Sequence, residues 1–200
     1  AGELLDSIAN EVERLRNVTE THLNRARRAP LTRRRTDLGE LVGRLLDFAR
    51  TELDQRKVIT HLDAPTEAWA EVDERLVKQA LWNLLRNGWE AMPGGGTLWL
   101  TVTAQKPSDE SDLERVSIQV EDSGQGIAEG IVEHLFEPFF TTKESGTGVG
   151  LVLVSEVATA HGGTIDVVAS QHGDGACLEL LLPIKTPSAD RSPSNPGVLA

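Results

Sequence analysis

Residues 122–151 read DSGQGIAEGIVEHLFEPFFTTKESGTGVGL and combine two groups of glycines with an acidic residue, an aromatic cluster and a lysine. The segment follows a run in which Val116, Ile118 and Val120 alternate with polar residues, a pattern that predicts a β-strand. The glycines that come next predict a tight turn, because glycine adopts unusual backbone conformations at little cost. We therefore expect Asp122 at the end of a strand, facing a pocket.

The second group of glycines is Gly146, Gly148 and Gly150. It directly precedes an apolar run with helical spacing, so these glycines are expected to open a helix. Free backbone N–H groups and the helix dipole make such an N-terminus attractive to phosphate. Neither group is specific by itself. The dinucleotide pattern G-x-G-x-x-G is set aside, because the glycine that follows Gly126 arrives too late, at Gly130.

A polar pair lies upstream, within QALWNLLRNGWEAM at residues 79–92. Asn83 and Asn87 are one helical turn apart, so both side chains lie on one face of the predicted helix. Mg²⁺ prefers oxygen ligands, keeps several waters and commonly bridges protein to phosphate. One asparagine together with a triphosphate is therefore a sensible magnesium site.

These segments, in this order, resemble the catalytic ATP-binding domain of two-component sensor histidine kinases of the nitrogen-regulation type. Residues 83–87 match the N box of that family, and residues 122–126 match its first glycine box. Residues 136–143, FEPFFTTK, match the F box, and residues 146–151, GTGVGL, match the second glycine box. The resemblance covers about residues 1–184. Four boxes in the same order are far more specific than any one of them.

The resemblance implies roles for individual residues. Asp122 would accept a hydrogen bond from the adenine N6 amino group, because a carboxylate is an acceptor only. Asn87 would be the Mg²⁺ ligand, and Lys143 would neutralise charge on the β- or γ-phosphate. The implied ATP-binding residues are Asn83, Asn87, Asp122, Gly124, Gly126, Ile127, Thr142, Lys143, Gly146, Thr147, Gly148, Val149, Gly150 and Leu151.

Asn83 separates two kinds of chemistry within the superfamily. Related hydrolytic ATPases, such as gyrase and the heat-shock chaperones, have a glutamate at the matching position, where it activates water. An amide cannot act as that general base. The resemblance therefore implies ATP that is hydrolysed poorly and held for transfer to a protein histidine.

Each role has a plainer alternative that the sequence leaves open. Asp122 alone would be interpreted as a turn-capping aspartate, and Asn87 as a polar residue of an exposed helix face. Lys143 would be a solvated loop residue, and the phenylalanines of the F box would simply anchor the segment to the domain. Arg86 and Glu90 approach the metal and phosphates in one interpretation and lie on the helix surface in the other.

Length, composition and charge bound the class of protein. The chain has 200 residues, of which 39% are hydrophobic, and a net charge of −11. No apolar run approaches the ~18 residues that a membrane helix needs, and no signal-peptide pattern opens the chain. The single Cys177 has no internal disulfide partner, so we expect a cytoplasmic location; membrane anchoring of a longer parent protein stays open.

Residues 1–30 are expected to form one long amphipathic helix, because apolar residues recur at three- and four-residue spacing between Leu4 and Ala26. One helix cannot bury such a stripe alone, so it must pack on another helix or on a second copy of the chain. The resemblance implies part of a dimerisation hairpin whose other helix carries the phosphoaccepting histidine. That histidine is expected to be absent here, since His22 lacks the acidic neighbour and the proline spacing of the family motif.

Arginines gather between Arg25 and Arg35. Nucleic-acid or acidic-lipid binding is the sharper interpretation of such a cluster, but no aromatic residues accompany it to stack on bases. We therefore expect a solvated helix end and linker, and no nucleic-acid partner.

The rest of the chain predicts the remaining helices and strands. Asp37 with Glu40, and then Asp73, predict the starts of two helices, and His161 is expected as a capping residue at the end of the third. Strands joined largely by hairpins are expected at residues 32–36, 57–62, 69–72, 97–104, 115–121, 164–170 and 176–183.

The expected fold class is α+β, an α/β two-layer sandwich of the Bergerat ATP-binding type with a mixed sheet, preceded by the long amphipathic helix. The expected domains are a partial dimerisation helix at residues 1–30, a catalytic ATP-binding domain at 31–184 and a disordered tail at 185–200. Proline and serine dominate that tail.

The expected function is the ATP-binding kinase core of a sensor histidine kinase. In the complete protein, the γ-phosphoryl group of Mg-ATP would pass to a histidine and then to a response regulator receiver domain. The expected partners are ATP or ADP, that receiver domain, and a second copy of the chain bound through the N-terminal helix. This piece would bind nucleotide without phosphorylating itself. Two alternatives stay open: a hydrolytic ATPase of the same superfamily, and a non-catalytic dimerising scaffold.

Overall fold

The structure is a computed structural model that describes residues 30–64, 67–105, 114–143 and 146–184. These residues form a five-stranded sheet in the order β2-β4-β5-β7-β6, and a two-stranded sheet of β1 and β3. The strands are β1 (Arg34–Asp37), β2 (Val58–Asp63), β3 (Trp69–Val72), β4 (Gly96–Gln105), β5 (Arg115–Asp122), β6 (Thr164–Val168) and β7 (Cys177–Pro183). The helices are α2 (Leu38–Gln55), α3 (Glu74–Glu90), the 3₁₀ helix η1 (Glu129–His134) and α4 (Gly150–His161).

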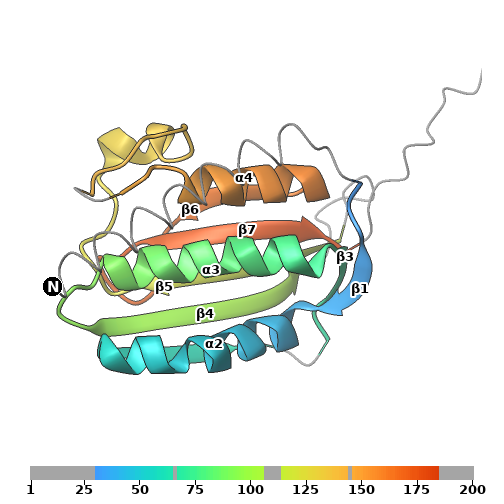
Figure 1. Cartoon of the computed structure of the whole chain (residues 1–200), viewed down its shortest axis with the longest axis horizontal. Coiled ribbons are helices and arrows are strands. Elements are labelled where there is room, and N and C mark those ends of the chain that lie inside the picture. Colours follow the sequence, from blue (N-terminus) through green and yellow to red (C-terminus); the bar gives the residue numbers. More distant parts are fainter. Residues whose placement is uncertain (1–29, 65–66, 106–113, 144–145, 185–200) are drawn as a thin grey trace, which may run out of the picture.

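The three α-helices lie against one face of the five-stranded sheet (Figure 1). Side chains alternate along a strand, so β4 directs Leu98, Leu100 and Val102 toward the helices, where all three are buried. β5 and β7 contribute to the same core in the same way. β2 pairs with β4 in parallel, and the other pairs are antiparallel. The expected α+β sandwich with a mixed sheet is confirmed.

Two aspartates fix the starts of helices, as predicted. Asp37 accepts hydrogen bonds from the backbone N–H groups of Gly39 at 3.0 Å and Glu40 at 3.2 Å. The reciprocal half of the expected capping box is not formed, because Glu40 pairs with Arg44 at 2.6 Å instead. Asp73 caps α3 in the same way.

The strands β2 and β3 follow each other in the sequence but belong to different sheets. β3 pairs with β1 at the end of the sandwich shown on the right of Figure 1. The expectation that hairpins join the strands is wrong here. β2 pairs in parallel with β4, and parallel neighbours need a crossover, which α3 provides.

His161 is not the cap of α4, and that prediction is wrong. The capping residue is Gly162, whose φ of 78° is a conformation that glycine favours. The His161 ring is buried; its Nδ1 lies 2.8 Å from the Val157 carbonyl oxygen, and its Nε2 accepts the Asp73 N–H at 2.9 Å. Burial lowers the pKa of this imidazole, which favours the neutral ring that these bonds require. His161 therefore ties the end of α4 to the start of α3.

Several expectations concern residues outside the described ranges. They are the N-terminal helix with His22, most of the connection between the strands expected at 97–104 and 115–121, and the tail at 185–200. Within the described ranges, none of the helices has both the length and the apolar character that crossing a membrane requires.

Candidate functional site

Asp122 ends β5 at the end of the sandwich that lies opposite β1 and β3 (Figure 1). Its side chain is buried, and Oδ1 accepts hydrogen bonds from the backbone N–H groups of Gly124 at 2.8 Å and Ala176 at 3.4 Å. Burial raises the pKa of this carboxyl, while the two N–H donors and the charge of Lys143 oppose the rise. The hydrogen bonds of the described residues use Oδ1 and leave Oδ2 for another donor.

The loop between β6 and β7 forms the wall behind Asp122. Asp122 donates its backbone N–H to the Ala176 carbonyl at 2.9 Å. A Cβ on Gly175 would lie 1.6 Å from the Asp122 carbonyl oxygen. A Cβ on Gly126, whose φ is +72°, would lie 2.3 Å from the Asp174 carbonyl oxygen. The close approach of two backbones therefore requires glycine at both positions.

Glu121 holds the same loop from the opposite face of β5. Its Oε1 accepts hydrogen bonds from the Ser170 hydroxyl at 2.6 Å and from the N–H groups of Gln171 at 3.0 Å and His172 at 2.7 Å. Burial would raise the pKa of this carboxyl, but the hydrogen bonds outweigh it and the pKa is lowered. Sequence reasoning missed Glu121, whose only signal was its position beside Asp122.

The segment of α3 that carries the two asparagines lies beside both glycine boxes. The Asn83 amide nitrogen donates to a backbone carbonyl one turn earlier at 2.9 Å, and its Oδ1 is 3.1 Å from where a Cβ on Gly150 would be. Asn87, one turn further on, is half-buried. A Cβ on Gly88 would lie 3.6 Å from the Asp122 Cβ. The fold thus brings the N box and the two glycine boxes together.

Gly150 begins α4, as the sequence predicts. The N-cap residue, Val149, makes no side-chain hydrogen bond to the first turn. No cap side chain therefore competes with a ligand for the backbone N–H groups of this turn. Gly148 has a φ of +63°, and a Cβ there would lie 2.3 Å from the Phe139 carbonyl carbon. Phe139 itself has a φ of 68° and is 66% exposed. The positive φ of Phe139 is strained for a residue with a side chain, whereas Gly148 adopts its positive φ at little cost and lets the two backbones approach closely.

Three charged side chains gather beside the asparagines. Lys143 Nζ lies 2.6 Å from Glu90 Oε2, and Arg86 Nε lies 3.6 Å from Glu90 Oε1. The sequence left the roles of Arg86 and Glu90 open. The structure brings both to the end of α3 that the Lys143 segment reaches.

The other predicted residues are less directly engaged. Thr147 Oγ1 accepts the Val149 N–H at 3.4 Å, Val149 is buried and Thr142 is exposed. Phe136 packs against the hydrophobic core and anchors the segment. Half-buried positions are taken by Gly124, Gly126, Ile127, Lys143, Gly146, Thr147, Gly148, Gly150 and Leu151.

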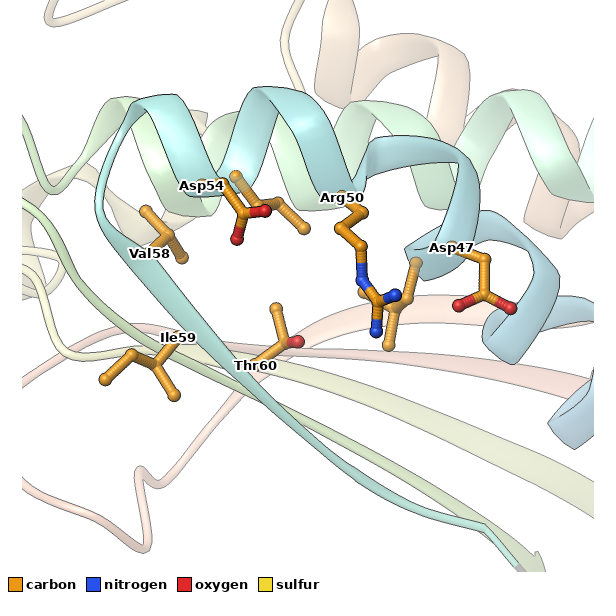
Figure 2. A pocket seen from close by; sticks show the side chains of 8 residues that line it. Asp47, Arg50, Asp54, Val58, Ile59 and Thr60 are labelled. Carbon is orange, nitrogen blue, oxygen red and sulfur yellow. The ribbon is translucent and has the colours of Figure 1, made fainter.

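A cavity of about 300 Å³ lies elsewhere, between α2 and β2 (Figure 2). Arg50 extends from α2 toward the strand, and Asp54 and Thr60 also line the space. None of the predicted site residues borders it.

Metal ligands were expected from an amide rather than from a carboxylate cluster. Among the residues that the structure describes, no group of three or more His, Cys, Asp or Glu side chains is arranged to hold a metal ion. Asn83 Oδ1 lies near the start of α4, and Asn87 follows Asn83 one turn further along α3. Such a set fits Mg²⁺ that takes its other ligands from phosphate and water.

A mixed sheet under three helices, with the glycine-rich segment at one end, is the Bergerat ATPase fold. The family described as Histidine kinase-, DNA gyrase B-, and HSP90-like ATPase matches residues 72–186, more than half of the chain. The chain belongs to this family.

Sensor histidine kinases are among the proteins to which the chain is similar. Sensor histidine kinase ZraS of Salmonella typhi is 35% identical over 91% of this chain and 38% of its own length. Full-length ShkA in complex with AMPPNP has a TM-score of 0.76 at 23% identity, covering 94% of this chain and 39% of that one. Histidine kinase ThkA in complex with response regulator protein TrrA has a TM-score of 0.68 at 25% identity, covering 91% of this chain and 51% of that one.

Within the family, the chain is therefore an ATP-binding kinase core of the sensor histidine kinase class. It spans well under half the length of the curated relative that it matches.

Proposed function

We propose that the chain binds Mg-ATP between α3, the end of β5 and the start of α4, with Asp122 selecting the base. The carboxylate is the observation that carries the proposal, because it is buried, held by two backbone donors and open at Oδ2. Adenine presents its N6 amino group as a donor, which is what such an acceptor requires.

The polyphosphate would lie over the second glycine box. The backbone N–H groups at the start of α4 and its helix dipole favour phosphate oxygens. Asn87 would ligate the Mg²⁺ that bridges to the phosphates, and Lys143 would neutralise charge from the opposite side. Positioning and charge neutralisation would provide most of the catalysis.

Phosphoryl transfer, rather than hydrolysis, is the proposed chemistry of the complete protein. The residue facing the start of α4 is Asn83, whose amide is tied to the backbone of its own helix and cannot remove a proton from water. The γ-phosphoryl group would therefore stay on ATP until it is transferred to a histidine, which we place outside this chain. From that histidine it would pass to a response regulator aspartate.

The proposed macromolecular partners are a response regulator receiver domain and a second copy of the chain. ThkA, a structural relative, is known in complex with its response regulator protein. The apolar stripe of residues 4–26 supports dimerisation of the parent protein. We propose a cytoplasmic location for this domain and no nucleic-acid partner.

Calorimetric titration with ADP and with AMPPNP, both in Mg²⁺, tests the binding proposal. The wild-type chain should bind both nucleotides saturably. Asp122→Ala should weaken binding by about 10- to 100-fold, since a hydrogen bond to a charged group is lost. The matched control is Asp166→Ala, an exposed aspartate on β6 that should bind like the wild type. A folded wild-type chain that binds neither nucleotide would leave the dimerising scaffold as the better account.

Incubation with γ-labelled ATP tests the proposed chemistry. The chain alone should neither become labelled nor release phosphate at an appreciable rate. Steady phosphate release without an added acceptor would instead support the hydrolytic ATPase. Label on His22 would contradict the proposal that the phosphoacceptor lies outside this chain.

A further inference from the structure

One carboxylate lies between two cations at the C-terminal end of α3. Glu90 Oε2 contacts Lys143 Nζ at 2.6 Å, and Glu90 Oε1 is 3.6 Å from Arg86 Nε. Lys143 belongs to the glycine-rich segment, whereas Arg86 and Glu90 are one turn apart on the same helix. These three side chains carry a net positive charge beside the start of α4.

Arg86 does not behave like an ordinary helix-surface arginine. At the C-terminal end of α2, Glu52 and the capping residue Arg56 have the same spacing and form a direct bond of 2.6 Å between two exposed side chains. The Arg86 side chain is only 26% exposed, and its Nε is buried without a hydrogen-bond partner. The order arginine before glutamate is also the less favourable one on a helix. The Glu90 pair therefore does not account for the position of Arg86.

The guanidinium of Arg86 lies instead at the start of α4. One of its terminal nitrogens is 3.9 Å from where a Cβ on Gly150 would be, and Asn83 Oδ1 is 3.1 Å from the same point. A guanidinium offers several donors in a planar fork that suits phosphate oxygens. At this position it would add a fixed cation to the backbone donors of the first turn.

We infer that Arg86 is a phosphate-binding residue and that Glu90 is a built-in counter-ion which nucleotide phosphate displaces. Without nucleotide, Glu90 balances Arg86 and Lys143. When the β- and γ-phosphates enter, both cations turn to phosphate oxygens and the Glu90 carboxylate returns to solvent. Nucleotide must therefore compete with Glu90 for its own binding groups. This inference rests on the proposed function and assigns residues that the family boxes leave open.

The test is calorimetric titration of single variants with ADP, AMPPNP and adenosine. Glu90→Gln should tighten ADP and AMPPNP binding by about two- to fivefold. The substitution removes the carboxylate that competes with phosphate for Lys143 and Arg86, and a partly exposed ion pair of this kind is weak. Arg86→Met should weaken both by about tenfold, because a charge-assisted phosphate contact is lost. Neither change should alter adenosine binding. The matched control is Glu52→Gln, which removes the comparable ion pair between Glu52 and Arg56 and should leave the affinities for all three ligands unchanged.

Several outcomes would overturn the inference. If Glu90→Gln weakens binding in Mg²⁺ but not in EDTA, Glu90 is a metal ligand. If Arg86→Met weakens adenosine as much as ADP, its role is structural, and thermal melting of the variant would show the loss of stability. Should Arg86→Met not fold, the exposed Glu90→Gln still decides the matter, and unchanged ADP affinity contradicts the inference. A wild type that binds ADP normally keeps the proposed function in each of these cases.

Discussion

The two ends of the proposed nucleotide site are built differently. Around Asp122, the base end is buried, and the carboxylates of Asp122 and Glu121 accept hydrogen bonds from backbone N–H groups on both faces of β5. Around Gly148 and Lys143, the phosphate end is half-exposed, has positive φ at Phe139 and pairs its lysine only with Glu90 among the described residues.

The difference follows from what each end has to recognise. A purine base is flat and mostly apolar, so a rigid, desolvated pocket with one acceptor can be formed in advance. Phosphates, and the charged groups that bind them, are strongly hydrated, so the binding groups at this end stay in contact with water before the ligand arrives. We therefore expect substitutions at the base end to cost stability, and those at the phosphate end to change affinity more than stability.

The largest effect is expected from Gly175→Ala. The new Cβ would overlap the Asp122 carbonyl oxygen, a backbone atom that cannot move without displacing β5. Unfolding in urea should show a loss of about 3 kcal/mol. Gly94→Ala is the matched control, because its Cβ would meet nothing within 4 Å. Equal stabilities of the two variants would mean that the base end is not tightly packed.

The next largest effect is expected from Glu121→Ala. The change leaves the hydroxyl and two N–H groups of the β6–β7 loop without their acceptor, so stability should fall by about 2 kcal/mol. ADP affinity should fall with it, because the loop supports Asp122. Glu179→Ala is the matched control: this carboxylate lies on the same face of the sheet and, among the described residues, accepts hydrogen bonds only from the strand side chains of Ser117 and Gln119. That control should leave ADP affinity unchanged.

Gly148→Ala tests the phosphate end. An alanine at a φ of +63° costs about 1 kcal/mol, and the Cβ would also press on the Phe139 backbone. ADP affinity should fall about fivefold, and the free energy of unfolding should fall by only about 1 kcal/mol, less than in Gly175→Ala. Gly130→Ala, in η1 of the same segment, has open space and should behave like the wild type. A large loss of stability in Gly148→Ala would contradict the contrast between the two ends.

The smallest effect near neutral pH is expected from protonation of Asp122. Its pKa is raised by burial, so nucleotide affinity should begin to fall at a higher pH than an ordinary carboxyl value of 3.8 would give. The pH dependence of folding stability has the opposite sign to that of nucleotide affinity. Between 3.8 and the raised pKa the folded state binds more protons than the unfolded state, so the contribution of Asp122 to stability decreases as pH rises. ADP titrations across mildly acidic pH check the affinity, and urea unfolding over the same pH range checks the stability, each compared with Asp122→Asn; wild-type profiles that match those of the variant would refute both statements.

Local chemistry made much of the molecule predictable. Asp37 and Asp73 cap helices through bonds to N–H groups two or three residues away, so the sequence alone locates both starts. Strand positions followed from apolar alternation in the same way. The turn at the first group of glycines and the helix start at the second were predicted too, although the atoms that exclude a side chain at these positions are known only from the fold.

Contacts between distant segments were not predictable. The His161 ring accepts the Asp73 N–H from 88 positions along the chain, and Glu121 holds a loop about 50 positions away. Nothing in either local pattern distinguishes these residues from a helix cap or a surface acid. The pairing of β3 with β1 and the gathering of Arg86 and Lys143 around Glu90 likewise depend on tertiary structure.

Base selection by Asp122 is the central claim, and comparing ADP with inosine diphosphate tests it most directly. Hypoxanthine has a carbonyl where adenine has the N6 amino group, so the acceptor on Asp122 would face another acceptor. Calorimetry should show that the wild-type chain binds ADP at least about tenfold more tightly than inosine diphosphate, with most of that preference lost in Asp122→Asn. Equal affinities for the two nucleotides in the wild type would contradict the account.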